Sequence, residues 1–269
     1  MAKQTDTKTE EALDLGILGL KKGTNILKVD VPPELEERVE TGIGWVDDVF
    51  GGGEGERGLT PSTSILFTGT PGAGKTTLAL QIANSWTQQG NICVYNTNEE
   101  SALQVRKTTK RLGMSSGFII GEDRLVPNLI EHCNWLREKN PGKKLLIIGD
   151  SIQTHDDGFY KDGGTNSMTP VRVTKRLTSY CKQTFSLCML IGQVNKDGKF
   201  NGKQTIKHDV DVHAHLLIDQ KPSSPSFGKR IFKIEKNRFG FSQVGYFLGL
   251  DGKKGLYEDA AWSPEVEME

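Results

Sequence analysis

A glycine-rich stretch in the first third of the chain carries the residue types that bind a nucleoside triphosphate. GTPGAGKTT (69–77), here called the P-loop, matches G-x-x-x-x-G-K-[ST], whose glycines let backbone N–H groups turn toward phosphate oxygens. We expect Lys75 to reach the β- and γ-phosphates and the Thr76 hydroxyl to bind Mg²⁺. The motif implies ATP and Mg²⁺ as cofactors, with the nucleotide held by Gly69, Thr70, Pro71, Gly72, Ala73, Gly74, Lys75, Thr76 and Thr77.

Polar side chains close three apolar runs that follow the P-loop. Asp150 ends LLIIGD (145–150), Glu99 and Glu100 end NICVYNTNEE, and Gln193 lies near the end of SLCMLIGQV. Ligands of open α/β sheets bind at the carboxyl ends of the strands, so we expect these residues near the P-loop. Asp150 would hold Mg²⁺ through water, Glu99 would polarise the water that attacks the γ-phosphate, and Gln193 would contact that phosphate.

Two of these assignments have structural alternatives. An aspartate that ends a strand can be a simple turn residue, and Glu99 and Glu100 can be acids that the dipole of a following helix favours. Because Asp150 follows a P-loop along the chain, we assign it to the metal. We assign Glu99 as the general base and Glu100 as its neighbour.

The elements that must position these residues alternate between helices and strands. Unbroken apolar strands separated by helices predict an α/β fold with a mostly parallel sheet covered on both faces. Three late strands are expected to extend this sheet as antiparallel hairpins. The predicted strands are 63–69, 91–97, 117–121, 143–150, 186–194, 213–220, 230–236 and 243–250, and the predicted helices are 74–90, 100–113, 123–140 and 168–185.

Composition places the chain among ordinary globular proteins. It has 269 residues, of which 35% are hydrophobic, and its 34 basic and 34 acidic residues give a formal net charge of zero. The four scattered cysteines form no C-x-x-C pair, which argues against zinc and for a reducing compartment. No apolar run is long enough to span a membrane and no signal peptide is evident. We therefore expect a cytoplasmic protein.

The sequence divides into three parts. Residues 1–36 are polar and charged, and they form either a flexible tail or a docking arm. Residues 37–260 are the predicted ATPase domain, and residues 261–269 are a C-terminal tail.

Two cations near the C-terminal end require an explanation. In KIEKNRFGF (233–241) Lys236 and Arg238 lie two residues apart, so on a strand they face the same side while Glu235 faces the other. Two long cations that point together need an anion, and the sequence places none nearby. They either contact a ligand or form a solvated basic strand end.

Several stretches together resemble the RecA-type core of the bacterial RadA (Sms) family. They occur in the order of that family and cover about residues 37–258. The combination of DSIQT with KNRFG is specific, because a generic P-loop protein rarely carries both. The stretches are ERVETGIGWVDDVFGGG (37–53), GTPGAGKTT (69–77), VYNTNEES (94–101), IIGDSIQT (147–154), IGQVNKDGKFNG (191–202), KHDVDV (207–212) and KNRFG (236–240).

This resemblance implies a RecA-fold ATPase that forms a hexameric ring and moves along DNA during recombination. In the family the KNRFG cations act at the interface between protomers. Lys236 and Arg238 would then face the triphosphate of the neighbouring subunit, with Phe239 and Gly240 setting the turn that aims them. The zinc-binding N-terminal segment and the Lon-like C-terminal domain of the family have no counterpart in the sequence, so we expect a core-only version.

The segment NKDGKFNGKQTIK (195–207) is the predicted DNA-binding loop. Lysines can follow the phosphates of a single strand, and an aromatic ring can stack on a base. The alternative is a solvated loop. The earlier loop 155–167 carries three aspartates and is a weaker candidate. The predicted DNA-binding residues are Lys196, Lys199, Phe200, Lys203 and Lys207.

The segment HDVDVHAH (208–215) contains histidines and aspartates, but its spacing matches no usual tetrahedral metal site, so we reject a metal there. Two functions follow from the sequence. The first is a DNA-binding RecA-family ATPase of the RadA type that acts on single-stranded DNA as a ring or filament. The second is a KaiC-like ATPase in which nucleotide drives assembly and the partner is a protein.

Overall fold

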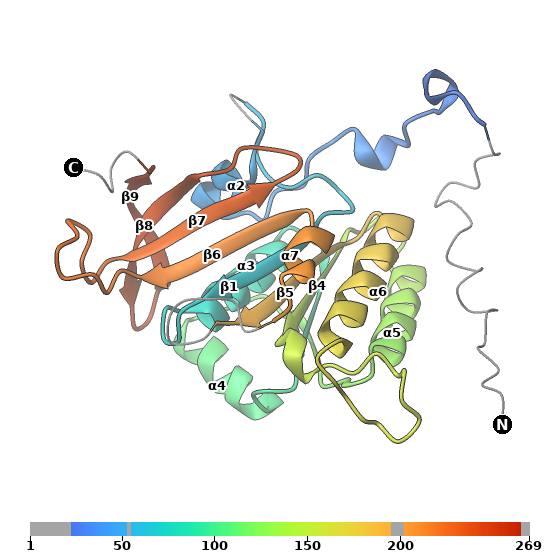
Figure 1. Ribbon diagram of the computed structural model, residues 1–269. Coiled ribbons are helices and arrows are strands. Elements are labelled where there is room, and N and C mark those ends of the chain that lie inside the picture. Colours follow the sequence, from blue (N-terminus) through green and yellow to red (C-terminus); the bar gives the residue numbers. More distant parts are fainter. Residues whose placement is uncertain (1–22, 53–54, 195–201, 265–269) are drawn as a thin grey trace.

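A nine-stranded sheet is the frame of the part that the computed structural model describes, residues 23–52, 55–194 and 202–264 (Figure 1). Its strand order is β3-β2-β4-β5-β1-β6-β7-β8-β9. Neighbouring strands are parallel from β3 to β6 and antiparallel from β6 to β9, which confirms the predicted fold class. The strands are β1 (Ser64–Gly69), β2 (Ile92–Thr97), β3 (Ile119–Gly121), β4 (Leu145–Asp150), β5 (Leu187–Gln193), β6 (Val212–Ile218), β7 (Arg230–Asn237), β8 (Val244–Asp251) and β9 (Gly255–Trp262).

Helices cover both faces of this sheet (Figure 1). One face packs against α2, α3 and α4, and the other against α5, α6 and α7. None of the helices within the described ranges combines the length and hydropathy needed to cross a bilayer. The α-helices are α2 (Gly44–Phe50), α3 (Lys75–Gln88), α4 (Ala102–Arg111), α5 (Val126–Lys139), α6 (Thr169–Thr184) and α7 (Thr205–Asp209), and short 3₁₀ turns span Ile26–Lys28, Pro33–Leu35 and Ile152–Thr154.

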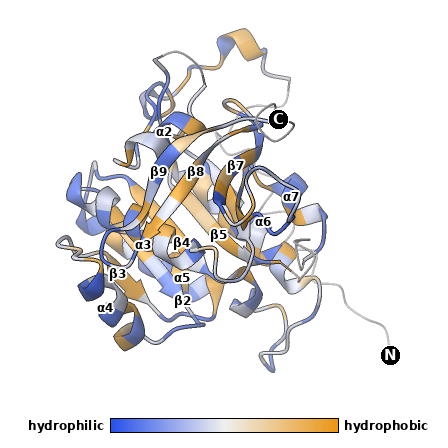
Figure 2. Ribbon diagram, turned by 90° about the vertical axis from the view of Figure 1, so that its left-hand side faces the viewer, coloured by the Kyte–Doolittle hydropathy of each residue, from blue (hydrophilic) through white to orange (hydrophobic). Residues whose placement is uncertain are grey.

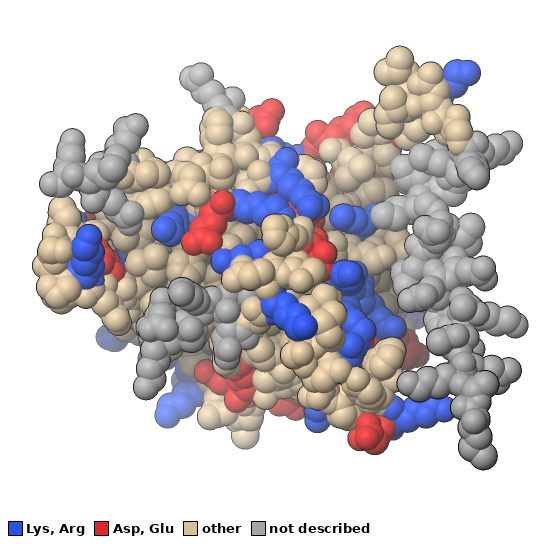
Figure 3. Space-filling view, in the orientation of Figure 1, with Lys and Arg blue, Asp and Glu red and all other residues tan. Residues whose placement is uncertain are grey.

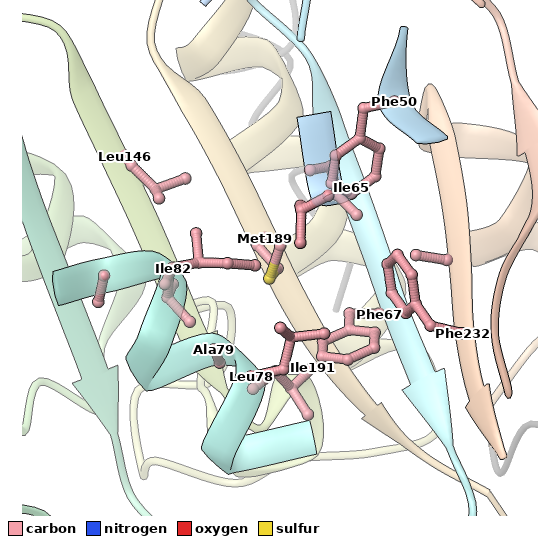
Figure 4. Close-up of a cluster of buried hydrophobic side chains, with 14 of the residues drawn as sticks. Phe50, Ile65, Phe67, Leu78, Ala79, Ile82, Leu146, Met189, Ile191 and Phe232 are labelled. Carbon is pink, nitrogen blue, oxygen red and sulfur yellow. The ribbon is translucent and has the colours of Figure 1, made fainter. Parts of the chain in front are cut away.

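The strand of the P-loop is buried on both faces, which explains its unbroken apolar sequence. Ile65 and Phe67 pack in the core beneath α3, whereas Leu66 packs on the opposite side with α5 and α6. Figure 4 shows Leu78 and Ile82 of α3 directed at the first of these cores. Figure 2 shows hydrophobic residues gathered on the strands and hydrophilic ones on outer helices such as α4. These contacts hold the end of β1 firmly against the start of α3.

The sequence did not predict α2, α7 or β9. Only Gly255, Leu256 and Trp262 of β9 are buried, so its sequence GLYEDAAW lacks the apolar run of the inner strands. A tight turn creates the strand, since the Asp251 carboxylate accepts backbone N–H bonds from Lys253 at 2.7 Å and Lys254 at 2.8 Å. Residues 255–262 therefore form a strand because they pair with β8, and their local hydrophobicity does not account for it.

A buried polar network joins β1, β6 and β7. The Thr68 hydroxyl lies 2.8 Å from His213 Nε2 and 2.7 Å from His215 Nδ1, and His213 Nδ1 lies 2.8 Å from Glu235 Oε2. The hydrogen bond with His213 lowers the pKa of Glu235 to about 2, and burial lowers the pKa of His215 to about 4. His213 and His215 thus form hydrogen bonds inside the sheet.

We predict that His215 makes folding stability fall with acid. An unfolded imidazole titrates near pH 6.5 and the folded one near 4, so the unfolded state binds more protons between these values. The free energy of unfolding should therefore drop by about 2 kcal/mol from pH 7 to pH 5 through this group alone. Urea unfolding of the wild type and of His215→Asn at both pH values measures the effect. Equal drops in the two proteins would contradict the assignment.

Candidate active site

A cavity of about 530 Å³ opens at the carboxyl edge of the parallel strands. The cavity lies where the P-loop, β4 and β5 meet, so residues that are far apart in the sequence line it together. Lys75, Thr76, Glu99, Asp150 and Gln193, all predicted site residues, line it together. The remaining lining residues are Gly69, Pro71, Gly72, Gly74, Thr77, Ser151, Ile191, Val194 and Leu250.

The P-loop has the backbone geometry of an anion cradle. Gly74 precedes α3 with a φ of 110°, a conformation that L side chains rarely adopt. Gly69 passes so close to β6 that a Cβ there would lie 2.0 Å from the Leu216 carbonyl oxygen. Since α3 begins at Lys75, the N–H groups of its first turn point at the cavity, where a phosphate is favoured.

Lys75 lies over the start of the P-loop. Its Nζ donates to the carbonyl oxygens of Gly69 at 2.9 Å and Thr70 at 3.3 Å. Burial lowers the pKa of Lys75, and the charges of Asp150 and Glu99 partly oppose this effect. Of the other predicted contacts, Ala73 is fully buried and the Thr70 hydroxyl accepts the Ile218 N–H at 3.1 Å.

Asp150 and Thr76 form a pair of oxygen donors. The Thr76 hydroxyl donates to Asp150 Oδ2 at 3.3 Å, and the Tyr95 hydroxyl donates to the same oxygen at 2.5 Å. Burial raises the pKa of Asp150, the Tyr95 bond lowers it, and the nearby charge of Glu99 raises it. A carboxylate beside a hydroxyl is a hard oxygen set that fits Mg²⁺, and the cation would favour the charged form.

Glu99 enters the cavity, whereas Glu100 is not among its lining residues. Glu99 Oε1 accepts a 2.7 Å hydrogen bond from Gln193 Nε2 and a hydrogen bond from the Ser151 hydroxyl. Helix α4 begins at Ala102 and is capped by Ser101, whose hydroxyl accepts the N–H of Gln104. Both glutamates therefore precede the cap, which weakens the alternative that they serve as first-turn acids of this helix.

Lys236 and Arg238 lie at the opposite edge of the sheet. Asn237 pairs with Val212, which pairs with Ile65 near the start of β1, so the two cations are remote from this chain's own P-loop. The prediction that no neighbouring group supplies an anion is wrong, because Arg238 Nη1 lies 3.1 Å from Asp211 Oδ1.

Lys236 also has partners within the chain. Its Nζ donates to the carbonyl oxygens of Lys207, His208 and Val210 at 2.9, 3.1 and 2.5 Å, which caps the end of α7. Glu235 lies where the register between β6 and β7 shifts, which interrupts the regular alternation assumed in its prediction. It also contacts α7, since its Oε2 lies 3.7 Å from Lys207 Nζ, and the same oxygen lies 2.8 Å from His213 Nδ1. The sequence did not reveal these partners, because the segment that forms the start of α7 was predicted as a loop.

The predicted DNA-binding residues fall into two groups. Lys196, Lys199 and Phe200 lie outside the described residues. Lys203 is exposed, and Lys207 Nζ lies 3.7 Å from Glu235 Oε2.

Tyr95 and Ser151 are residues of the site that the sequence did not predict. Tyr95 stands in an apolar strand, and a fully buried hydroxyl is itself a signal that a polar partner is near. Ser151 directly follows Asp150, and only the fold reveals that its hydroxyl reaches Glu99.

The chain is similar in sequence to known bacterial proteins. The chain is 36% identical over 218 residues to the DNA repair protein RadA of Mycobacterium tuberculosis, which covers 79% of this chain and 42% of that protein. It is 31% identical over 266 residues to RadA of Brucella abortus, covering 94% of this chain and 54% of that protein. A family model described as "ATPase: KaiC" matches residues 39–128. This chain has a RadA-like RecA-type ATPase core.

The RadA-like core corresponds to part of its relatives. RadA of Escherichia coli is 33% identical over 247 residues, which cover 90% of this chain and 48% of that protein. The chain thus spans about half the length of the curated relatives it matches. The P-loop and the strand of Glu99 lie inside the range that the ATPase family model matches.

We predict that Asp150→Asn removes the Mg²⁺-dependent part of ATP binding. Loss of the carboxylate charge should weaken Mg²⁺-ATP at least tenfold, about 1.4 kcal/mol, and leave metal-free ATP binding unchanged. Thermal denaturation with ATP, in the presence of Mg²⁺ or EDTA, measures both parts, and Asp156→Asn at the nearby loop is the matched control. An unchanged Mg²⁺-dependent shift would contradict the metal role.

Proposed function

We propose that this chain is a Mg²⁺-dependent ATPase of the RadA type that acts on single-stranded DNA as an oligomer. The observation that supports it is the cavity in which Lys75, Thr76, Asp150, Glu99 and Gln193 meet at one edge of the sheet. The set contains a phosphate cradle, a metal-binding pair and a carboxylate base, which together are the parts that phosphoryl transfer to water requires.

The residues of the cavity divide the reaction between them. The P-loop N–H groups and Lys75 hold the phosphates and offset the charge that builds up on the γ-phosphate. Mg²⁺, held by Thr76 and Asp150, would supply further charge stabilisation on the phosphate oxygens. Glu99 orients the attacking water and takes its proton as the water adds to the γ-phosphorus, while the bond from this phosphorus to the bridging oxygen breaks and ADP leaves.

Gln193 connects this chemistry to the predicted DNA-binding loop. It ends β5 and donates a 2.7 Å hydrogen bond to Glu99, and the segment 195–207 begins two residues later. A γ-phosphate that accepts a bond from Gln193 competes with Glu99 for this amide. Nucleotide binding therefore changes the hydrogen bonds of Gln193, which lies two residues before the loop. This change couples DNA affinity to the bound nucleotide.

A basic face over α6 and α7 favours nucleic acid as the partner. Helix α6 contains Arg172, Lys175, Arg176 and Lys182 and no acidic residue, and of these Arg172 forms a salt bridge with Asp157 of the preceding loop. Lysines and arginines gather over α6 and α7 in the view of Figure 3. Burial lowers the pKa of Lys236, the charge of Arg238 lowers it further, and the charges of Asp211 and Asp209 oppose this. Such a surface attracts the phosphates of a nucleic acid strand despite the zero net charge.

We predict that Glu99→Gln reduces ATP turnover at least 100-fold, because the base is lost while binding contacts remain. Glu100→Gln, outside the cavity, is the matched control and should keep wild-type turnover. Phosphate release with and without single-stranded DNA measures both variants, and DNA should stimulate the wild type. Turnover indifferent to DNA, together with ATP-dependent assembly, would favour the KaiC-like alternative with a protein partner.

The cations of the opposite edge are proposed to serve the next protomer. In a head-to-tail assembly, an amino-edge group of one copy meets the carboxyl edge of another. Arg238 is the better probe, because Lys236 caps α7 while the Arg238 guanidinium is nearly half exposed. Gly240 sets the turn that follows, since a Cβ there would lie 2.2 Å from the Gly51 carbonyl oxygen.

We predict that Arg238→Ala and Glu99→Gln are each inactive alone and active when mixed. An equal mixture creates interfaces that join an intact Glu99 site to an intact Arg238, about a quarter of the total. ATP turnover of the mixture, compared with each variant at the same total concentration, measures this rescue. A mixture as inactive as its components, in assemblies of wild-type size, would exclude the role in trans.

A further inference from the structure

We propose that Ser151, held by His155 and Asn96, is a positioning residue that aims the Glu99 carboxylate at the attacking water. The inference rests on the proposed role of Glu99 as the base. It adds a chain of three buried side chains, from β2 and from the segment after β4, behind the catalytic carboxylate.

The hydrogen bonds to Glu99 are unequal between its two oxygens. Within the described residues the side-chain donors to this carboxylate, Ser151 Oγ and Gln193 Nε2, both bind Oε1. Two donors on one oxygen orient the carboxylate and leave Oε2 available to accept a proton from water. Gln193 lies at the mouth of the site and is exposed, whereas Ser151 is fully buried, so Ser151 is the fixed donor of the two.

His155 fixes the backbone that carries Ser151. Its Nδ1 lies 2.7 Å from the Ser151 carbonyl oxygen, which can only accept, so Nδ1 carries the proton. Its Nε2 is then free to accept the 2.8 Å bond from the Asn96 amide. Burial lowers the pKa of His155, which agrees with a neutral ring of this tautomer.

Asn96 is itself oriented by the chain beside β3. Its Oδ1 accepts the Asp123 N–H at 3.1 Å, and its Nδ2 donates to the Asp123 carbonyl oxygen at 2.8 Å. The amide orientation is therefore determined by its partners, and the second Nδ2 proton serves His155. Gly121 keeps the space open, because a Cβ there would lie 2.4 Å from Asn96 Oδ1.

The chain joins two strand ends that carry the chemistry. Asn96 belongs to β2, which leads to Glu99, and Ser151 follows Asp150 at the end of β4. The links from Asn96 through His155 and Ser151 thus hold the base at a fixed position relative to the metal-binding carboxylate. A carboxylate held rigidly favours the reactive geometry. A small displacement of it would lower the rate of hydrolysis far more than it would weaken ATP binding.

The experiment compares Ser151→Ala with two variants of His155. Ser151→Ala should lower kcat about 10- to 100-fold with an unchanged KM for ATP, since it removes a hydrogen bond to a charged group. His155→Leu should have a smaller effect of the same kind. His155→Gln, whose amide can donate to the Ser151 carbonyl and accept from Asn96, should recover most of the wild-type kcat. ATP-induced thermal stabilisation confirms that each variant is folded.

The decisive measurement is single-turnover hydrolysis of Ser151→Ala in the Glu99→Gln background. A residue that acts only through Glu99 has no further effect once that base is gone, so the double variant should equal Glu99→Gln. Multiplicative losses would mean that Ser151 acts elsewhere and would overturn the inference. Wild-type kcat in Ser151→Ala beside an inactive Glu99→Gln would also overturn it and leave the base assignment intact. Activity in Glu99→Gln itself would instead remove the proposed function.

Discussion

The parallel pairing of β2, β4, β5 and β1 is the constraint on which the site depends. The register sets Thr97 beside Asp150 and Gly69 beside Gln193, so the carboxyl ends of four strands reach one edge together. Backbone hydrogen bonds along each strand hold this register, and cores on both faces of the sheet keep it from slipping. The sheet therefore positions the P-loop, the Thr76–Asp150 pair and Glu99 relative to one another.

Burial gives the site its electrostatic character. It lowers the pKa of Lys75 and raises that of Asp150, because both charged forms lose hydration at this edge. A triphosphate with its metal brings the opposite charge to each group and offsets this loss. The same low-dielectric surroundings strengthen the hydrogen bonds that orient Glu99. The burial that disfavours the charged forms of Lys75 and Asp150 thus also favours the binding of a nucleotide with its metal.

The two edges of the sheet carry complementary groups. Cations of β7 lie at the amino edge, and the phosphate cradle lies at the carboxyl edge of β1. Arg238 and Lys236 are held by Asp211 and by carbonyl oxygens at the end of α7, so their direction is set before any partner arrives. A molecule with unlike edges suits head-to-tail association. Helix α7, which overlaps the end of the predicted DNA-binding segment, lies against the amino edge.

The sequence by itself determined the P-loop, the alternation of helices with apolar strands and the polar residues that close those strands. These features are local, because a motif or a periodic pattern depends on neighbours along the chain. Only the tertiary structure decided that Glu99 enters the cavity beside Gln193, that Asp211 pairs with Arg238, and that β9 joins the sheet. Only the tertiary structure likewise showed the contacts of Ser151 and His155. Their partners lie across strand ends far apart in sequence, and a hydrogen bond depends on distance in space, which no local pattern encodes.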